Sequence, residues 1–259
     1  MGLPLISFGF EHYPDYSENA KRIERAGDAE HNIGVPRGSN FLKQSLQDSQ
    51  NFRCQASKRL EIRDWDKRYC SRERATEDLQ AAPNPLLIET VERLARDPWL
   101  ARDPKRPRQA LDLASGAGRN ALWLAEQGWN VTAVDGSAAA IAILRERAAE
   151  RGLNLDARVA DLERDEFPIE RAAWDLVAIL YYLQRNLFEA AKRGVAPGGV
   201  LIGIAHITEP GEEPTPHRLR RGELETYFAG WEIVHHYEGA SRDAAHQRPV
   251  AEIVARSCS

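Results

Sequence analysis

The apolar positions of the chain become regular near residue 110. From there on, short unbroken apolar runs alternate with segments in which apolar residues recur every three to four positions. Unbroken apolar runs are typical of parallel strands that helices cover on both faces. The pattern therefore predicts an α/β fold built on a doubly wound, mostly parallel sheet.

The positions of the elements follow from these runs and their turn residues. Strands are expected at 109–114, 130–135, 155–161, 174–183, 199–207, 231–239 and 248–257, and helices at 118–127, 137–152, 184–195 and 220–230. Only a polar loop separates the last two strands, and it is too short to hold a crossover helix. We therefore expect these strands to pair as a hairpin, which makes one edge of the sheet antiparallel.

The first hundred residues are less regular. Residues 1–55 are rich in Gly, Pro, Asn, Gln and Ser and have few regularly spaced aliphatic residues, which predicts a poorly ordered N-terminal extension. Helices are expected at 57–70 and 84–97. The expected organisation is this extension followed by one folded domain over residues 56–259.

Composition and charge limit the classes of partner. The 35 basic and 39 acidic residues give a net charge of -4, which does not favour binding to nucleic acid or to an anionic membrane. No apolar stretch reaches the roughly 18 residues that a membrane-spanning helix needs, and the first ten residues lack the features of a secretory signal. We expect a cytoplasmic protein that acts on a small molecule. The sequence does not predict its oligomeric state.

The three cysteines, Cys54, Cys70 and Cys258, are far apart in the sequence and form no Cys-x-x-Cys pair. This spacing indicates neither a zinc site nor a disulfide framework. We therefore expect three free thiols and no bound metal.

The stretch ASGAG, at residues 114–118, joins the first strand of the predicted sheet to a helix. Its small side chains allow a ligand to contact the backbone closely, and the helix that follows offers unpaired amides to an anionic group. In an open parallel sheet, the turn after the first strand is a usual place for a nucleotide. We therefore expect a cofactor at this turn.

Two cofactors fit the turn. Residues 116–121 match the Gly-x-Gly-x-x-Ala pattern of dinucleotide enzymes, and Asp135 ends the next strand, where it suits a ribose. Asp112, two residues before the turn, distinguishes between the two cofactors. Its carboxylate would repel a pyrophosphate but attract the ammonium and sulfonium groups of S-adenosylmethionine. Asp112 therefore favours the methyl donor, while an NAD-dependent oxidoreductase and a non-catalytic nucleotide-binding module stay as alternatives.

The ends of the next two strands carry further acids. Asp135 can accept hydrogen bonds from both ribose hydroxyls, which either cofactor possesses. Asp161 can accept from the adenine amino group, and the backbone amide of Leu162 would face a ring nitrogen. The alternative for Asp161 is that it only caps a turn.

Several stretches together resemble class I S-adenosylmethionine-dependent methyltransferases, most closely the small bacterial enzymes related to the tellurite-resistance and thiopurine methyltransferases. These stretches are LDLASGAGRNALWLAEQGWNVTAVD, VADLE, WDLVAILYYLQRNLFEAAKRGVAPGGVLIGI and the closing hairpin, within residues 60–257. The resemblance implies a Rossmann-like sheet of seven strands with one antiparallel edge strand. It also implies S-adenosylmethionine as the cofactor.

The turn, the strand ends and this resemblance together give a set of expected donor-binding residues. They are Asp112, Ala114, Gly116, Gly118, Asn120, Asp135, Gly136, Asp161 and Leu162.

DWDKRY, at residues 64–69, resembles the family's N-terminal helix that closes over the donor. The resemblance places Trp65 and Arg68 near the cofactor, with Tyr69. Trp65 could instead anchor this helix to the core. The chain departs from the family at Ala114, where a glycine is usual, and an alanine is tolerable there if its backbone keeps a negative φ.

The acceptor side is expected beyond the strands that begin at 174 and 199. Tyr181 and Tyr182 follow the first strand as wall residues, and Arg185 could hold an anionic substrate or only pair on its helix. His206 follows the second strand and could take a proton near neutral pH.

The expected reaction is transfer of a methyl group to a small-molecule nucleophile, such as a thiol or a metalloid oxyanion, by in-line displacement. Whether a general base is needed depends on the acceptor. The sequence does not identify that acceptor.

Overall fold

The computed structural model describes residues 60–71, 81–96 and 107–258, and all structural statements below concern these residues. The expectation for residues 1–55 lies outside them, as do the first three residues of the helix expected at 57–70. The division into an extension and one domain therefore stays a prediction.

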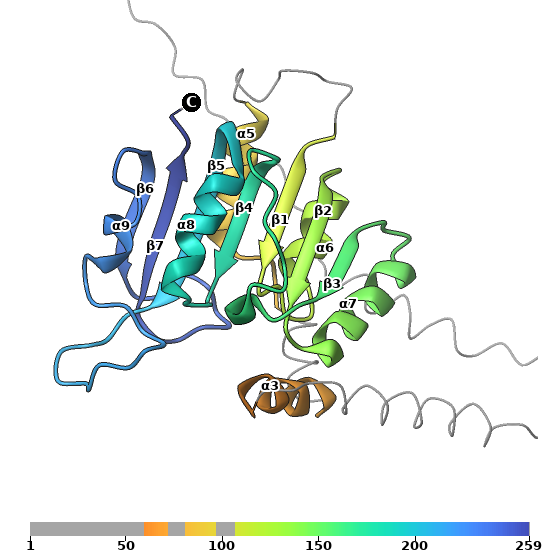
Figure 1. Cartoon of the computed structure of the whole chain (residues 1–259), viewed down its shortest axis with the longest axis horizontal. Helices are drawn as coiled ribbons and strands as arrows, with labels where there is room; N and C mark the ends of the chain where they lie inside the picture. The colour runs from red at the N-terminus through yellow and green to blue at the C-terminus, as the bar shows by residue number, and fades with distance from the viewer. Residues whose placement is uncertain (1–59, 72–80, 97–106, 259) are drawn as a thin grey trace, which may run out of the picture. The chain divides into compact units, whose positions relative to one another are not determined.

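Seven strands form one sheet (Figure 1). They are β1 (Gln109–Leu113), β2 (Asn130–Asp135), β3 (Asp156–Val159), β4 (Trp174–Leu180), β5 (Val195–His206), β6 (Glu232–Gly239) and β7 (Val250–Arg256). Their order across the sheet is β3-β2-β1-β4-β5-β7-β6. The pairs among β1 to β5 are parallel, which confirms the predicted α/β class.

The closing hairpin is also confirmed. β7 pairs antiparallel with both β5 and β6, so it is the one reversed strand of the sheet. It lies one place in from the edge, and β6 forms the edge itself.

Helices cover both faces of the sheet (Figure 1). They are α5 (Pro85–Ala95), α6 (Arg119–Glu126), α7 (Ala138–Glu150), α8 (Arg185–Gly194) and α9 (Glu223–Thr226). A short 3-10 turn, η1 (Leu162–Arg164), follows β3, and α3 (Leu60–Cys70) lies beyond the carboxyl ends of the strands and contacts α7. Successive residues of a strand face opposite sides. In β1, Ala110 packs into the core beneath α5, α6 and α7, while Leu111 and Leu113 pack into the core beneath α8 and α9.

Several elements differ in length from their predictions: β3 and β4 are shorter than expected, and β5 and α9 differ for reasons that the structure shows. β5 begins at Val195 rather than residue 199, because a register shift in its pairing with β4 lets the strand continue through the Pro-Gly-Gly stretch. α9 covers four residues rather than 220–230. Gly222 precedes it with a φ of 75°, so a left-handed residue bounds the helix at its start.

Cys70 is disulfide-bonded, so the expectation of three free thiols is wrong. Its partner lies outside the described residues, and Cys258 is free and exposed. Spacing in the sequence misled the prediction, because pairing depends on how close two cysteines come in the fold. Among the described helices, none is both long and apolar enough to cross a membrane.

Candidate functional site

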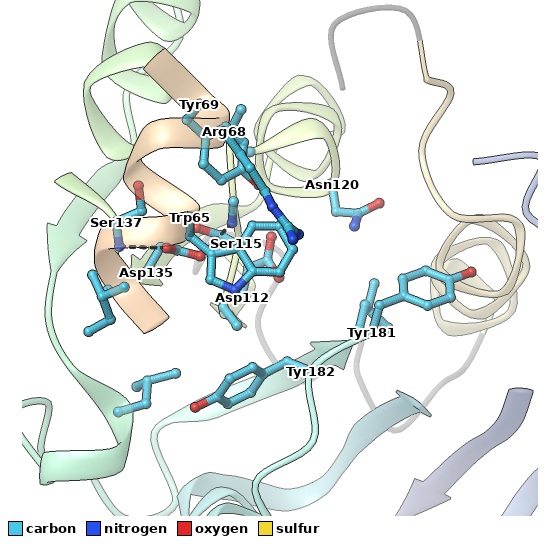
Figure 2. Close-up of a pocket in the computed structure, with 18 of the residues that line it drawn as sticks. Trp65, Arg68, Tyr69, Asp112, Ser115, Asn120, Asp135, Ser137, Tyr181 and Tyr182 are labelled. Carbon is cyan, nitrogen blue, oxygen red and sulfur yellow. Dashed lines mark hydrogen bonds between the residues drawn. The ribbon is translucent and has the colours of Figure 1, made fainter. Parts of the chain in front are cut away.

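A pocket of about 490 Å³ lies at the carboxyl ends of β1, β2 and β4 (Figure 2). The strand order reverses between β1 and β4, which is where open α/β sheets bind ligands. All eleven residues expected to bind the cofactor line this pocket. They are Trp65, Arg68, Asp112, Ala114, Gly116, Gly118, Asn120, Asp135, Gly136, Asp161 and Leu162.

The turn after β1 is tightly wound. Ala114, Gly116 and Gly118 all have positive φ, at 58°, 56° and 80°. Ala114 therefore does not meet the condition of a negative φ under which an alanine would be tolerated here without strain. The chain must reverse between β1 and α6 within five residues, so Ala114 adopts a left-handed conformation that costs about 1 kcal/mol for a residue with a Cβ.

Gly118 is required for a second reason. A Cβ built on it would lie 2.2 Å from Cδ1 of Leu144 on α7. The residue before α6 therefore packs directly against the Leu144 side chain of α7, which leaves no room for a Cβ on Gly118.

Asp112 carries a carboxylate oxygen without a hydrogen-bond partner. The residue is buried, and its Oδ2 has no partner among the described residues. Burial, together with the charge of Asp135, raises the pKa of Asp112 to about 7, although the charge of Arg119 and the amide of Ala121 act in the opposite direction. An unsatisfied buried acceptor is costly, so this oxygen suits a ligand that brings a donor, above all a cationic one.

Asp135 joins the tip of β2 to the turn. Its Oδ2 accepts a hydrogen bond from the amide of Gly116 at 2.8 Å, and its Oδ1 accepts one from the amide of Ser137 at 2.8 Å. A carboxylate has about four acceptor positions, so these two amides orient Asp135 without exhausting it. The carboxylate is thereby held at the pocket wall, where Figure 2 shows it beside Ser137.

Asp161 lines the pocket and also caps a turn. It is buried at the pocket, and its Oδ1 accepts from the amide of Glu163 at 3.0 Å, which caps η1. Gln184 donates from Nε2 to the carbonyl of Leu162 at 3.1 Å and accepts from the hydroxyl of Tyr182 at 2.9 Å. Through Gln184, these bonds link Leu162 to Tyr182, which both line the pocket.

Helix α3 presents Trp65 and Arg68 to the pocket (Figure 2). Trp65 is 43% exposed, and the guanidinium carbon of Arg68 lies 4.7 Å from its ring centroid. The neighbouring Asp66 is buried and accepts hydrogen bonds from the Ser137 hydroxyl at 2.6 Å and the Ala139 amide at 3.2 Å. Asp66 therefore attaches α3 to the start of α7, and the alternative in which Trp65 anchors the helix is not supported.

The acceptor-side candidates divide into two groups. Tyr181 and Tyr182 line the pocket, but Arg185 and His206 are not among its lining residues. Arg185 donates to the carboxylate of Glu223 at 2.7 Å and to the carbonyl of Pro216 at 2.8 Å, so its placement supports the ion-pair role.

His206 lies next to Tyr181, with ring centroids 5.6 Å apart. Burial lowers the pKa of His206, which keeps it neutral near pH 7. Its place outside the pocket lining does not support direct contact with an acceptor.

Two histidines that sequence reasoning did not select, His217 and His246, line the pocket instead. Both lie in polar loops without periodic patterning, so no sequence signal distinguished them from solvated residues. Asn120 lines the pocket as expected, and its Oδ1 accepts from the backbone amide of Asn84 at 2.9 Å. Asn120 therefore also ties α6 to the start of α5.

A known protein family matches the part of the chain that carries most of the pocket residues. Residues 110–199 match the family described as "Methyltransferase domain". These residues run from β1 into β5 and contain the glycine turn, Asp112, Asp135 and Asp161.

Two curated relatives match over 139 residues. A "Probable S-adenosyl-L-methionine-dependent methyltransferase TehB" of Haemophilus influenzae is 25% identical, over 51% of this chain and 49% of its own length. "Hemagglutinin 1" of Eikenella corrodens is 28% identical, over 51% of this chain and 46% of its own length. The chain thus spans about half the length of the curated relatives that it matches.

A solved structure shares the fold. The crystal structure of TehB from Haemophilus influenzae superposes with a TM-score of 0.51 at 23% identity, covering 64% of this chain and 62% of that one. The resemblance to class I S-adenosylmethionine-dependent methyltransferases is therefore confirmed for the fold and for the sequence of its central segment.

Proposed function

We propose that this chain, whose residues 110–199 match a methyltransferase domain, binds S-adenosylmethionine and transfers its methyl group to a small-molecule nucleophile. The observation that carries the proposal is the buried, unpartnered oxygen of Asp112 beside the bare backbone turn. A pyrophosphate at the same place would meet that carboxylate with like charge, which disfavours the dinucleotide alternative.

The residues present fit the cofactor. The ammonium group would donate to Asp112, and the ribose hydroxyls would donate to Asp135. Asp161 and the Leu162 amide would hold the adenine edge. The pocket of about 490 Å³ lies within the usual range for small-molecule sites.

When bound, the cofactor supplies a methyl group on a sulfonium, which is already a good leaving group. The protein then has to align the acceptor with that methyl group and exclude water. Trp65 and Arg68 of α3 would cover the donor, and Tyr181 and Tyr182 would form the acceptor wall. His206 does not line the pocket, so we propose no general base there; a thiolate or a metalloid oxyanion needs none.

The finer identity of the acceptor belongs to this proposal as well. The similarity to TehB favours tests with metalloid oxyanions, including tellurite, alongside thiols and small phenols. A cytoplasmic location and the absence of nucleic-acid and membrane partners stay predictions from composition.

Calorimetric titration with S-adenosylhomocysteine tests the cofactor. We expect micromolar binding by the wild-type protein and at least about tenfold weaker binding by Asp135→Ala, because two oriented acceptors for the ribose are lost. Asp156→Ala is the matched control, since Asp156 lies at the start of β3 and outside the pocket. Binding of NAD with no response to S-adenosylhomocysteine would establish the oxidoreductase alternative.

A second measurement separates an enzyme from a binding module. The protein is incubated with S-adenosylmethionine and each acceptor of the panel, and S-adenosylhomocysteine is quantified. An enzyme releases more S-adenosylhomocysteine with an acceptor than in a control reaction to which no acceptor is added. Tight cofactor binding with no release on any acceptor would support the non-catalytic module.

A further inference from the structure

The loop that joins β6 to β7, residues 240–249, contributes to the pocket wall. His246 of this loop lines the pocket and stacks on Tyr181, with ring centroids 3.4 Å apart and 7° between the ring planes. Tyr181 directly follows β4, so the stack joins two segments that are far apart in the sequence. We call this stacked pair of rings the Tyr181–His246 wall.

Tyr181 is held in an unfavourable backbone conformation. Its φ is 61°, in the left-handed region that bulky residues rarely adopt. Such a conformation persists only where the surroundings enforce it, and it is found most often at functional sites. The Tyr181 amide donates to the carbonyl of Ile204 at 2.7 Å, which fixes its backbone but not its ring.

Asp243 of the same loop fixes the ring. It accepts a hydrogen bond from the Tyr181 hydroxyl at 3.1 Å and one from Nδ2 of Asn84 at 3.3 Å. Asn84 also donates to the Tyr181 hydroxyl at 3.0 Å, so the three side chains form a closed triangle of hydrogen bonds. Asn84 is the N-cap of α5, so its side-chain amide links both the Tyr181 hydroxyl oxygen and Oδ2 of Asp243 to the start of that helix.

Arg119 connects this triangle to the glycine turn. It is the first residue of α6 and donates to both carboxylate oxygens of Asp243, at 3.2 Å and 2.5 Å. The side chains of Arg119 and Asp243 are only 10% and 6% exposed, so the pair is shielded from water. Burial opposes ionisation of Asp243, but the hydrogen bonds and charge of Arg119 outweigh it and lower the pKa of Asp243.

We propose that Asp243 is a positioning residue for the methyl acceptor, because it holds the Tyr181–His246 wall in a fixed place relative to the turn at 114–118. Asp243 is not among the residues that line the pocket, so it acts through Tyr181 and Arg119 rather than on a ligand. The inference rests on the proposed function, and it assigns a role to a loop outside the matched family segment.

The test compares donor affinity with acceptor kinetics in Asp243→Asn, Tyr181→Phe and the double variant. The donor side is measured as the Kd of S-adenosylhomocysteine. The acceptor side is measured as KM and kcat with whichever of thiophenol, selenite and phenol gives the highest turnover. Arg242→Gln is the matched control, since Arg242 is the next residue in the loop but pairs with Glu89 and Glu252, away from the pocket.

Each single variant is expected to raise the acceptor KM about tenfold, because each removes one hydrogen bond that involves a charged group. The donor Kd should change by less than about threefold. The double variant should be no worse than Asp243→Asn alone, because both substitutions break one unit. Equal effects on donor and acceptor, or an additive double variant, would overturn the proposal.

A readout without turnover complements the kinetics. In the wild-type protein, the Tyr181 ring should shift the His246 ring protons upfield in the NMR spectrum. Asp243→Asn should remove much of this shift, while Arg242→Gln should retain it. A shift that persists in Asp243→Asn contradicts the positioning role, whether or not the protein binds S-adenosylhomocysteine, so this result is distinct from a failure of the proposed function.

Discussion

Asp112 and Asp135 lie near the carboxyl ends of neighbouring strands at the pocket, and burial of Asp112 together with the charge of Asp135 raises the pKa of Asp112 to about 7. A carboxylate that is half protonated near neutral pH can respond to a cationic ligand. If the ligand brings an ammonium group, binding will favour the ionised form and release the proton. The two acids thus couple donor binding to pH.

The first prediction concerns this coupling. The affinity for S-adenosylhomocysteine should fall about tenfold between pH 8 and pH 6, because only about a tenth of Asp112 is ionised one unit below its pKa. Calorimetry in buffers of different ionisation enthalpy should show proton release near pH 6.5. Adenosine, which lacks the ammonium group, is the control ligand, and its affinity should stay constant over this range. A pH-independent affinity for both ligands would contradict the pairing of Asp112 with the ammonium.

The second prediction separates stability from binding at Asp112. Its raised pKa means that the folded state holds the proton more tightly than the unfolded state, where the value is 3.8. The stabilising contribution of the neutral form is therefore fully present below about pH 4 and is lost as the pH rises through about 7. Asp112→Asn removes the charge, so it should raise the free energy of unfolding at pH 8 by about 1 to 3 kcal/mol.

At pH 5 this gain should be smaller, because Asp112 of the folded wild-type protein is then neutral, but it should approach zero only below about pH 4, where Asp112 is neutral in the unfolded state as well. Urea unfolding at both pH values measures the difference. The same variant should lose affinity for S-adenosylhomocysteine at pH 8. A variant that is both less stable at pH 8 and unchanged in binding would show that Asp112 plays only a packing role.

The third prediction concerns the attachment of α3. Asp66→Ala removes the acceptor for the Ser137 hydroxyl and the Ala139 amide, which are both buried at the start of α7. We expect α3 to become sensitive to limited proteolysis, and the affinity for S-adenosylhomocysteine to fall about tenfold as Trp65 and Arg68 leave the pocket. Arg63→Ala, on an exposed position of the same helix, should change neither measurement. Release of α3 without any change in affinity would show that the helix does not cover the donor.

The sequence predicted those parts of the fold and site that depend on local patterns. The alternation of strands and helices, the closing hairpin and the turn at 114–118 follow from apolar periodicity and turn residues. Asp112 was found because it lies two residues before that turn, and Asp135 because it ends the next strand, since parallel strands bring their carboxyl ends to one edge.

The unpredicted parts depend on distant partners. Asp66 meets Ser137 across 71 positions, and Asp243 meets Arg119 across 124. No spacing rule connects residues so far apart, and the loop that holds Asp243 has no periodicity. The positive φ of Ala114 escaped prediction for a different reason, since a left-handed alanine is set by the geometry of the reversal and not by its own preference.

The last prediction distinguishes backbone strain from steric exclusion in the glycine turn. Gly118 and Gly128 share a φ of 80°, but a Cβ on Gly128 would meet nothing within 4 Å, whereas one on Gly118 would overlap Leu144. Gly128→Ala should therefore cost only the left-handed strain, about 1 kcal/mol. Gly118→Ala should cost a further 1 to 3 kcal/mol, roughly the range for overpacking.

Adding Leu144→Val to Gly118→Ala should recover part of the additional loss, because the shorter side chain makes room for the new methyl group. The free energy of unfolding of all three variants is measured in urea. Differences between these values give the cost of the left-handed backbone and the cost of the steric overlap. Equal losses for Gly118→Ala and Gly128→Ala would show that the Leu144 side chain moves aside without cost. A larger loss at Gly118, recovered by Leu144→Val, would show that position 118 requires glycine for steric reasons as well as for its φ.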